Sequence, residues 1–252
     1  MVPSFPTDAR KVTLRHLLES TSGIPDFTNR PEWTAHLAQC ESPEAFLARF
    51  AGPPQWEPGA QWFYSNTGHY LLGMIIERAS GMTRAEYLRQ RFFKPLGMIH
   101  TRTMAEPPVA GEKLASGYEQ DKSDVRPAPV VDDSQVGAAG DLISTVDDRL
   151  LWDAAVRAGK VLAPAMLARA RTPITTTQKP PPFEWTPGGW ARFQLDGVTC
   201  FGAKGGIDSG YTTWLADCPE RALAVVVLAN STDPRGPPDK LGNELAKELL
   251  AR

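Results

Sequence analysis

The fold class of this chain is decided by a stretch in its last third, residues 190–229: WARFQLDGVTCFGAKGGIDSGYTTWLADCPERALAVVVLA. The pair Asp196-Gly197 separates two runs rich in β-branched and aromatic residues, which is a strong signal of a two-residue hairpin turn. Residues 211–216 and 222–229 have the composition of two further strands, and only a short segment joins them. Consecutive strands with short connections pair in antiparallel order. The stretch therefore predicts an antiparallel meander.

The segments on both sides of this stretch have helical periodicity. Upstream, apolar residues recur at helical spacing over residues 71–79, and Gly81 stands where a C-terminal glycine is expected. Thr83 and Glu86 form the pattern of a capping box that opens another helix. Downstream, a closing helix is predicted from three leucines that share one stripe, Leu241, Leu245 and Leu249.

The order of these elements predicts an α+β fold. Helices come first, antiparallel strands follow and a last helix closes the chain, whereas a doubly wound α/β fold needs strands and helices in alternation. We expect one domain over residues 1–252, with a mainly helical region at 12–172 and the strands and closing helix at 188–252. Polar stretches at 105–134 and 172–187 are expected to be surface loops.

The composition is that of a globular protein without a strongly charged surface. Of the 252 residues, 27 are Lys or Arg and 29 are Asp or Glu, so the formal net charge is -2. Nucleic-acid binding needs a concentrated positive patch, so no nucleic-acid partner is expected. The longest apolar run, 222–229, is far shorter than the roughly 20 residues of a membrane helix. We expect neither a membrane span nor a signal peptide in the given chain, and its compartment stays open.

The sequence contains no metal or nucleotide signature. The three cysteines, Cys40, Cys200 and Cys218, are far apart and form no CxxC motif, so neither a disulfide scaffold nor a thiolate zinc site is indicated. We expect them to be small, partly buried hydrophobic residues. Structural roles are also expected for the scattered histidines, His16, His36, His69 and His100. No metal ion or organic cofactor is therefore predicted.

Two tripeptides have residue types suited to catalysis. Residues 64–66, YSN, lie between a Pro-Gly turn and the helix predicted at 71–79, so their side chains are expected at a helix entrance. Residues 204–206, KGG, lie at a predicted strand, where glycines allow a substrate backbone to approach closely. Each tripeptide taken alone is more often a local cap or turn. Their significance comes from their order and their neighbours.

With those neighbours, the chain resembles the serine β-lactamase-related family, which groups class C β-lactamases, D-alanyl-D-alanine carboxypeptidases and related esterases. The resemblance extends from about Val12 to Asn230 and implies a β-lactamase or penicillin-binding-protein-like fold. It is carried by four segments: VTLRHLLESTSGIPDF (12–27), PGAQWFYSNTGHYLLGMIIERASGMTRAEYLRQRFFKPLGM (58–98), GAAGDLISTVDDRLLWDAAVRAGKVL (137–162) and FGAKGGIDSGYTTWLADCPERALAVVVLANST (201–232).

The resemblance implies roles for the residues at the matching positions. Tyr64 would be the family's tyrosine, a phenol that acts as a base only where nearby ammonium groups favour the phenolate. Lys204 would be one such cation or would engage a substrate carboxylate, and Asn66 would hold a substrate amide or a neighbouring lysine. These three side chains are expected to converge on one cleft. A substrate-binding strand, with an N–H that donates to the oxyanion at its end, would be formed by Gly205, Gly206 and Ile207.

The sequence departs from the family at the nucleophile. The family carries its serine in a Ser-x-x-Lys motif on a helix upstream of the first matching segment, and no lysine of this chain has a serine three places before it. The nearest imitation, Thr176 to Lys179, falls in a predicted loop. We therefore expect a partial domain of the family, without its N-terminal strands and nucleophile helix, and assign no nucleophile within the chain.

Two functions agree with this pattern. The first is a serine hydrolase that acts through an acyl-enzyme on an amide, β-lactam or ester, with this chain alone inactive. The second is a non-catalytic module or pseudoenzyme that binds peptides or lactam-like ligands, or docks a complementing chain. In both, the expected partner is a small molecule or peptide, with a possible complementing N-terminal segment. Trp62 and Trp185 are candidates for lining a substrate cleft.

Overall fold

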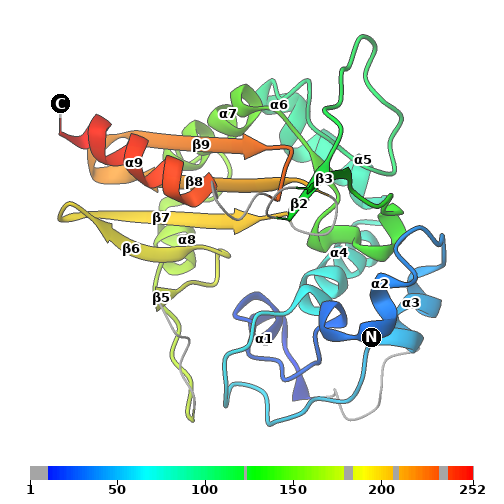
Figure 1. Ribbon diagram of the computed structural model, residues 1–252. Coiled ribbons are helices and arrows are strands. Elements are labelled where there is room, and N and C mark those ends of the chain that lie inside the picture. Colours follow the sequence, from blue (N-terminus) through cyan, green and yellow to red (C-terminus); the bar gives the residue numbers. More distant parts are fainter. Residues whose placement is uncertain (1–10, 122–123, 179–183, 207–209, 233–237, 252) are drawn as a thin grey trace.

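The strands of the last third form an antiparallel sheet of five strands in the order β5-β6-β7-β8-β9 (Figure 1). They belong to a computed structural model that describes residues 11–121, 124–178, 184–206, 210–232 and 238–251. The strands are β5 Glu184–Trp185, β6 Ala191–Leu195, β7 Val198–Gly205, β8 Thr212–Cys218 and β9 Leu223–Ala229. Helices precede this sheet, so the predicted α+β class is confirmed.

The hairpin between β6 and β7 turns at the predicted residues. Leu195 pairs with Val198, which leaves Asp196 and Gly197 as the two turn residues. Their φ angles are 48° and 82°, in the left-handed region that a type I′ turn requires. β7 then pairs with β8 and β8 with β9, both antiparallel, so the predicted meander is confirmed.

Helix α9, Pro238–Leu250, packs on one face of the sheet (Figure 1), and its buried residues are Pro238, Gly242, Ala246 and Leu250. A Cβ atom at Gly242 would lie 2.2 Å from the Trp214 ring, so only glycine allows this close approach. The leucine stripe from which the helix was predicted faces solvent instead: Leu241, Leu245 and Leu249 are 51%, 39% and 43% exposed. The bulk of Trp214 therefore places Gly242 and its small neighbour Ala246, rather than the leucine stripe, against the sheet.

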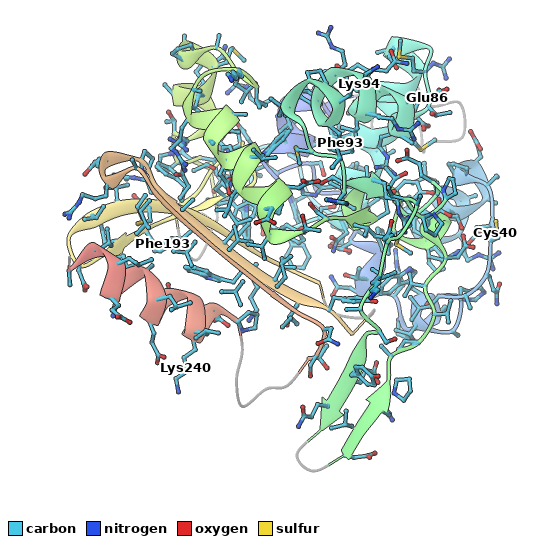
Figure 2. The ribbon with its side chains drawn as sticks, turned by 90° about the horizontal axis from the view of Figure 1, so that it is seen from above. Cys40, Glu86, Phe93, Lys94, Phe193 and Lys240 are labelled. Atoms are coloured by element: carbon cyan, nitrogen blue, oxygen red, sulfur yellow. A yellow bond between two sulfur atoms is a disulfide. The ribbon has the colours of Figure 1, made fainter. Side chains whose placement is uncertain are left out.

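The opposite face of the sheet is covered by α7, Val146–Arg157, and α8, Pro164–Ala170. Figure 2 shows the sheet seen from above, between the red helix α9 and the green helix α7. The carboxylate of Asp217 on β8 is 5% exposed and accepts hydrogen bonds from Arg157, at 2.8 Å, and from Arg171. The guanidinium of Arg171 also lies 4.7 Å from the centre of the Phe201 ring. A buried ionic cluster thus joins the helices to the sheet.

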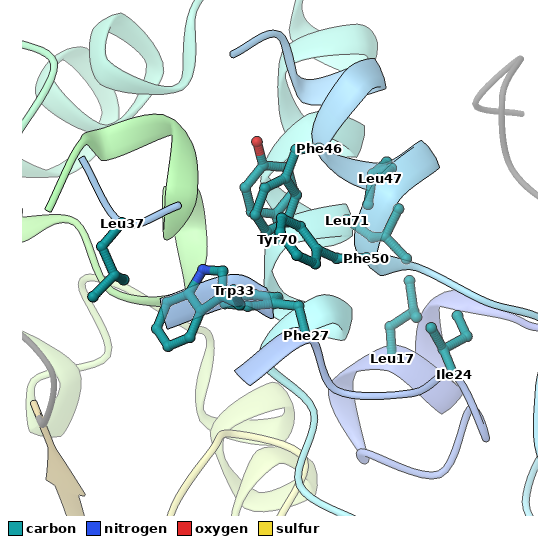
Figure 3. Close-up of a cluster of buried hydrophobic side chains, with 10 residues drawn as sticks. All are labelled: Leu17, Ile24, Phe27, Trp33, Leu37, Phe46, Leu47, Phe50, Tyr70 and Leu71. Carbon is teal, nitrogen blue, oxygen red and sulfur yellow. The ribbon is translucent and has the colours of Figure 1, made fainter. Parts of the chain in front are cut away.

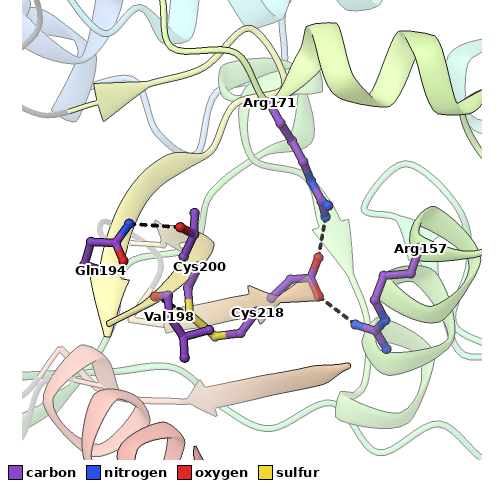
Figure 4. The surroundings of a disulfide bond; sticks show 8 residues. Arg157, Arg171, Gln194, Val198, Cys200 and Cys218 are labelled. Carbon is purple, nitrogen blue, oxygen red and sulfur yellow. Dashed lines mark hydrogen bonds and ion pairs between the residues drawn. A yellow bond between two sulfur atoms is a disulfide. The ribbon is translucent and has the colours of Figure 1, made fainter. Parts of the chain in front are cut away.

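Two of the three cysteines are bonded to each other, which corrects the sequence-based expectation. Cys200 on β7 and Cys218 on β8 form a disulfide on the α9 side of the sheet (Figure 4). Both are buried, as expected, but they are not free apolar side chains. Cys40 was expected to be partly buried and is exposed. The pairing was missed because it depends on strand register: Phe201 is opposite Asp217, which brings the neighbouring cysteines together.

The helical region has its own aromatic core (Figure 3). The Phe46 ring stacks on Tyr70 with centroids 4.5 Å apart, and Phe27 contacts both of these rings edge-on. No helix in the described part of the chain is both long and apolar enough to cross a membrane. The short helices of this region are α1 Leu14–Leu18, η2 Phe27–Asn29, α2 Pro31–Thr34, α3 Pro43–Phe50, α5 Arg84–Leu88, η3 Arg89–Phe93, α6 Lys94–Leu96, η4 Asp133–Gln135 and η5 Gly137–Ala139, and η6 Pro219–Arg221 lies between β8 and β9.

The longest helix, α4 at Asn66–Ser80, spans the helix predicted around residues 71–79. Ser65 caps its N-terminus by accepting from the Gly68 N–H at 3.1 Å. Gly81 ends it in the left-handed conformation, with φ of 71°. The predicted capping box is present, with Thr83 and Glu86 in reciprocal hydrogen bonds at the start of α5. These caps fix where α4 begins, and therefore where the residues just before it lie.

The stretch expected to be a surface loop at 105–134 contains a hairpin instead. Strands β2 Tyr118–Asp121 and β3 Asp124–Pro127 pair antiparallel, and Tyr118 donates its N–H to the carbonyl of Asn230 at 3.0 Å. A second small sheet pairs β1 Arg102–Thr103 with β4 Leu142–Ile143. The loop expected at 172–187 contains β5 near its end. Such short, polar strands carry too little periodicity to be predicted from sequence.

We predict that Asp217→Asn destabilises the protein by about 3 kcal/mol, because it leaves two partly buried guanidinium groups without their carboxylate. The matched control is Glu184→Gln, which removes the partner of Arg192 in a pair whose side chains are 33% and 54% exposed. That change should cost less than about 1 kcal/mol. Urea unfolding of the two variants measures both values, and equal losses would contradict the importance of the buried cluster.

Candidate active site

Tyr64 lies on an extended segment just before α4. The N–H of Phe63 donates to the carbonyl of Ser20 at 2.9 Å, which holds this segment against the turn that follows α1. Ser65 is the N-cap of α4 and Asn66 is the first residue of the helix. The cap therefore places Tyr64 and Asn66 at the helix entrance, as predicted from sequence.

The Tyr64 ring is surrounded by other rings and keeps 39% of its surface exposed. Its centroid lies 5.5 Å from that of His69 and 5.8 Å from that of Trp185, whose ring is 5.7 Å from Trp62. Trp185 belongs to β5, so these contacts join the helix entrance to the sheet. Trp62 and Trp185, the candidates for lining a cleft, thus lie beside Tyr64, and lining a cleft stays a prediction for both.

The electrostatic surroundings of Tyr64 do not favour a phenolate. Partial burial raises the pKa of the Tyr64 phenol above its usual value of 10.0, and the negative charge of Asp26 raises it further. A base needs the opposite shift near neutral pH, and the resemblance implied nearby ammonium groups as its cause. In the described residues the charged group that acts on Tyr64 is an anion.

Asn66 is held by Asp26. The backbone N–H of Asn66 donates to Asp26 Oδ2 at 2.9 Å, and its side-chain Nδ2 donates to the same oxygen at 3.1 Å. Asp26 is 4% exposed and also caps η2, where it accepts from the N–H and the hydroxyl of Thr28, both at 2.9 Å. Asp26 lies outside both tripeptides from which the site was predicted, although its position immediately before Phe27-Thr28 is typical of an N-cap.

Lys204 lies near the end of β7 on the face that α9 covers. Its ammonium is 3.4 Å from Asp239 Oδ1 in the first turn of α9, and the two side chains are 58% and 38% exposed. Exposed pairs of this kind contribute little, typically 0 to about 1 kcal/mol. The contact therefore gives the position of the Lys204 ammonium, but it is too weak to hold the ammonium in that position.

The packing of the chain itself explains why glycine occupies both positions after Lys204. Gly206 has φ of 76°, and a Cβ there would lie 2.2 Å from the carbonyl oxygen of Tyr211. A Cβ at Gly205 would lie 3.1 Å from the hydroxyl of Thr213. The close approach that glycine allows is thus made by β8 and by Tyr211 just before it, and approach of a substrate stays a prediction. Ile207, the predicted end of the binding strand, lies outside the described residues.

The structure brings some predicted site residues together and leaves others apart. Tyr64 and Asn66 share the entrance of α4, and both interact with Asp26. Within the described ranges, no hydrogen bond or ion pair joins Lys204 to either of them, so convergence of the three stays a prediction. Nor does the described chain place three or more His, Cys, Asp or Glu side chains so as to hold a metal ion. His69, expected to be structural, directs Nδ1 to the Ser65 carbonyl at 2.9 Å.

We predict that Tyr64 ionises above pH 10, because burial and the carboxylate of Asp26 both disfavour its phenolate. The ultraviolet absorbance of phenolate is measured during an alkaline titration, and the curve of Tyr64→Phe is subtracted from that of the wild type. The difference isolates Tyr64 from the other tyrosines. A midpoint at or below pH 10 would show that a cation near Tyr64 outweighs burial and Asp26.

Comparison with known proteins gives the family. The family model described as Beta-lactamase matches residues 1–249. Penicillin-binding protein 4* of Bacillus subtilis (strain 168) is 38% identical over 125 residues, which cover 48% of this chain and 27% of that protein. The chain spans between about a quarter and two thirds of the length of the first curated relatives that it matches.

Solved structures extend the likeness over the whole chain. The octameric penicillin-binding protein homologue from Pyrococcus abyssi has a TM-score of 0.78 and 27% identity, over 96% of this chain and 56% of that one. D-amino acid amidase from Ochrobactrum anthropi SV3 has a TM-score of 0.79 and 26% identity, over 98% of this chain and 72% of that one. The fold is therefore that of β-lactamases and penicillin-binding proteins, and the chain belongs to the beta-lactamase family of serine hydrolases.

Proposed function

We propose that this chain carries the tyrosine and lysine motifs of a serine hydrolase that acts through an acyl-enzyme on an amide, β-lactam or ester. The observation that carries the proposal is the entrance of α4, where the cap at Ser65 holds Tyr64 partly exposed and Asn66 fixed. Family membership supports the reaction class. The substrates would be small molecules or peptides.

In the proposed reaction a serine oxygen attacks the carbonyl carbon of the substrate and gives its proton to Tyr64. The bond to the leaving group breaks, the phenol returns the proton to that group, and water then releases the acyl chain by the reverse path. Tyr64 needs a cation nearby for this role, because its surroundings raise its pKa. Lys204 is the proposed source, since an exposed pair with Asp239 is the one ion pair of its ammonium among the described residues. Asn66 would contact the substrate amide, and the N–H of Ile207 would donate to the oxyanion.

The proposal places the nucleophile outside these 252 residues, since none of their lysines follows a serine at the spacing of Ser-x-x-Lys. Two surfaces support packing of a further segment that carries it. Among the described strands β9 lies at one edge of the sheet, and α9 exposes its leucine stripe beside that sheet. In the family, N-terminal strands extend the sheet at this edge. The segment would belong to the complete protein or to a complementing chain.

Among the possible bonds, an amide is the best supported target. The solved relatives of similar fold include a D-amino acid amidase and a D-stereospecific amidohydrolase from Streptomyces, at 26% and 25% identity. Their names describe hydrolysis at amides rather than at lactams. We therefore propose amides or peptides as the first substrates to try, with β-lactams and esters as comparisons.

We predict that the 252-residue chain alone forms no stable acyl adduct with a penicillin, a cephalosporin or an activated ester. Oxyanion donors and a tyrosine cannot replace the attacking oxygen. Intact-mass spectrometry after incubation measures this directly. A stoichiometric adduct on any serine or threonine would show that the chain contains a nucleophile of its own.

In a second experiment, the missing nucleophile is added on a separate segment. The chain is co-expressed with a segment bearing Ser-x-x-Lys from a solved relative, and hydrolysis of an amino acid p-nitroanilide is followed. The proposed roles require activity that Tyr64→Phe and Lys204→Met abolish, while Lys247→Met, on the far end of α9, leaves it unchanged. Ligand binding without hydrolysis in every combination would favour the alternative, a non-catalytic binding module.

A further inference from the structure

The buried carboxylate of Asp26 contacts Asn66 at two places. Its Oδ2 accepts from the Asn66 backbone N–H at 2.9 Å and from the Asn66 Nδ2 at 3.1 Å, and its Oδ1 lies 3.4 Å from the same Nδ2. Oδ1 is kept in place by Thr28, whose N–H and hydroxyl both donate to it at 2.9 Å. Asp26 is only 4% exposed, so few other rotamers are open to it.

The chemistry of these groups fixes which way the Asn66 amide points. An ionised carboxylate can only accept hydrogen bonds, so the amide must present its NH₂ group to Asp26 and turn its oxygen away. A flipped amide would set its oxygen against the carboxylate oxygens and lose both contacts. The described residues offer Asn66 Oδ1 no hydrogen-bond partner, so this oxygen is open to a ligand.

We propose that Asp26 is a positioning residue of the active site: it locks the side-chain amide of Asn66 so that Oδ1 is presented as a hydrogen-bond acceptor. The ligand group that meets Oδ1 is then a donor, such as the N–H of a substrate amide or an ammonium. Where this donor is the N–H of a substrate amide, an ester lacks it, and the lock then favours amides and peptides. This inference rests on the proposed function for its catalytic meaning, but the lock itself exists in the chain without substrate.

Asp26 acts on Tyr64 as well as on Asn66. The groups that face Tyr64 are His69 on α4, Trp185 on β5 and the carboxylate of Asp26, and the negative charge of Asp26 raises the pKa of the phenol. One carboxylate thus orients the amide and adds to the effect of burial, which is the larger cause of the raised pKa of Tyr64. Removing the charge of Asp26 should therefore change both the orientation of the Asn66 amide and the pKa of Tyr64.

A cap with the same local geometry elsewhere in the chain provides a matched control. Asp132 is the N-cap of η4 and accepts from the N–H of Ser134 at 3.0 Å and from its hydroxyl at 2.6 Å. Asp26 has the same relation to Thr28. Asp132 differs in having neither an asparagine amide nor Tyr64 as a partner. Loss of charge at Asp132 therefore reproduces the effect on a cap without the effect on the site.

The experiment compares Asp26→Asn with Asp132→Asn in the ligand-free 252-residue chain. Asparagine is also a good N-cap, so both variants retain the turn. The chain has 5 tyrosines, so ¹³Cζ-labelled tyrosine gives few signals, and Tyr64→Phe assigns the one that matters. We expect Asp26→Asn to lower the pKa of Tyr64 and to abolish the protection of the Asn66 side-chain amide protons against exchange. Asp132→Asn should change neither.

Two results would overturn the proposal. One is an Asp26→Asn protein that folds and keeps the wild-type Tyr64 titration and Asn66 amide exchange. The other uses the wild type alone and holds even if the variant does not fold: Asn66 side-chain amide protons that exchange as fast as those of Asn243 on α9. Both are measured without substrate, so they are independent of whether the acylation and hydrolysis experiments succeed.

Discussion

The carboxylate of Asp217 holds the helices α7 and α8 against the sheet. It extends from β8 to Arg157 at the end of α7 and to Arg171 just after α8, in a site that excludes most solvent. A carboxylate shared by two guanidinium groups fixes direction as well as distance, since each pair has a preferred planar geometry. Because Tyr64 reaches the sheet through the Trp185 ring, the placement of the candidate site relative to β7 also requires this junction to hold.

The charged groups around the candidate site hold Asn66 more firmly than they hold Lys204. Asn66 is held by a buried carboxylate, and removing a buried acceptor leaves unpaired donors at a cost of about 1 to 3 kcal/mol. In the part of the chain that the structure describes, Lys204 pairs with Asp239 alone, and both side chains of this pair are exposed. The amide is therefore fixed and the ammonium is free to exchange partners. The proposed site would combine a fixed acceptor on Asn66, a protonated Tyr64 and an ammonium on Lys204 that other groups can attract.

The sequence was sufficient where local chemistry decides the structure and insufficient where a distant side chain does. The Asp196-Gly197 turn, the end of α4 at Gly81 and the capping box at Thr83 depend on neighbouring residues, and all three were predicted. The face that α9 buries depends on the bulk of Trp214, and the Cys200–Cys218 bond depends on strand register. Trp214 lies far from α9 in the sequence, and the register of β7 on β8 cannot be read from the residues around either cysteine.

The same distinction applies within the site. Tyr64, Asn66 and Lys204 were selected through motifs, whereas Asp26 lies 40 residues from Asn66 and in sequence looks like an ordinary cap for η2. Its second role exists only because η2 packs against the entrance of α4. A motif names the groups that react, but their orientation comes from residues that the fold brings to them. The polarity of the Asn66 amide, and with it the kind of ligand atom it can meet, is set by such a residue rather than by the motif.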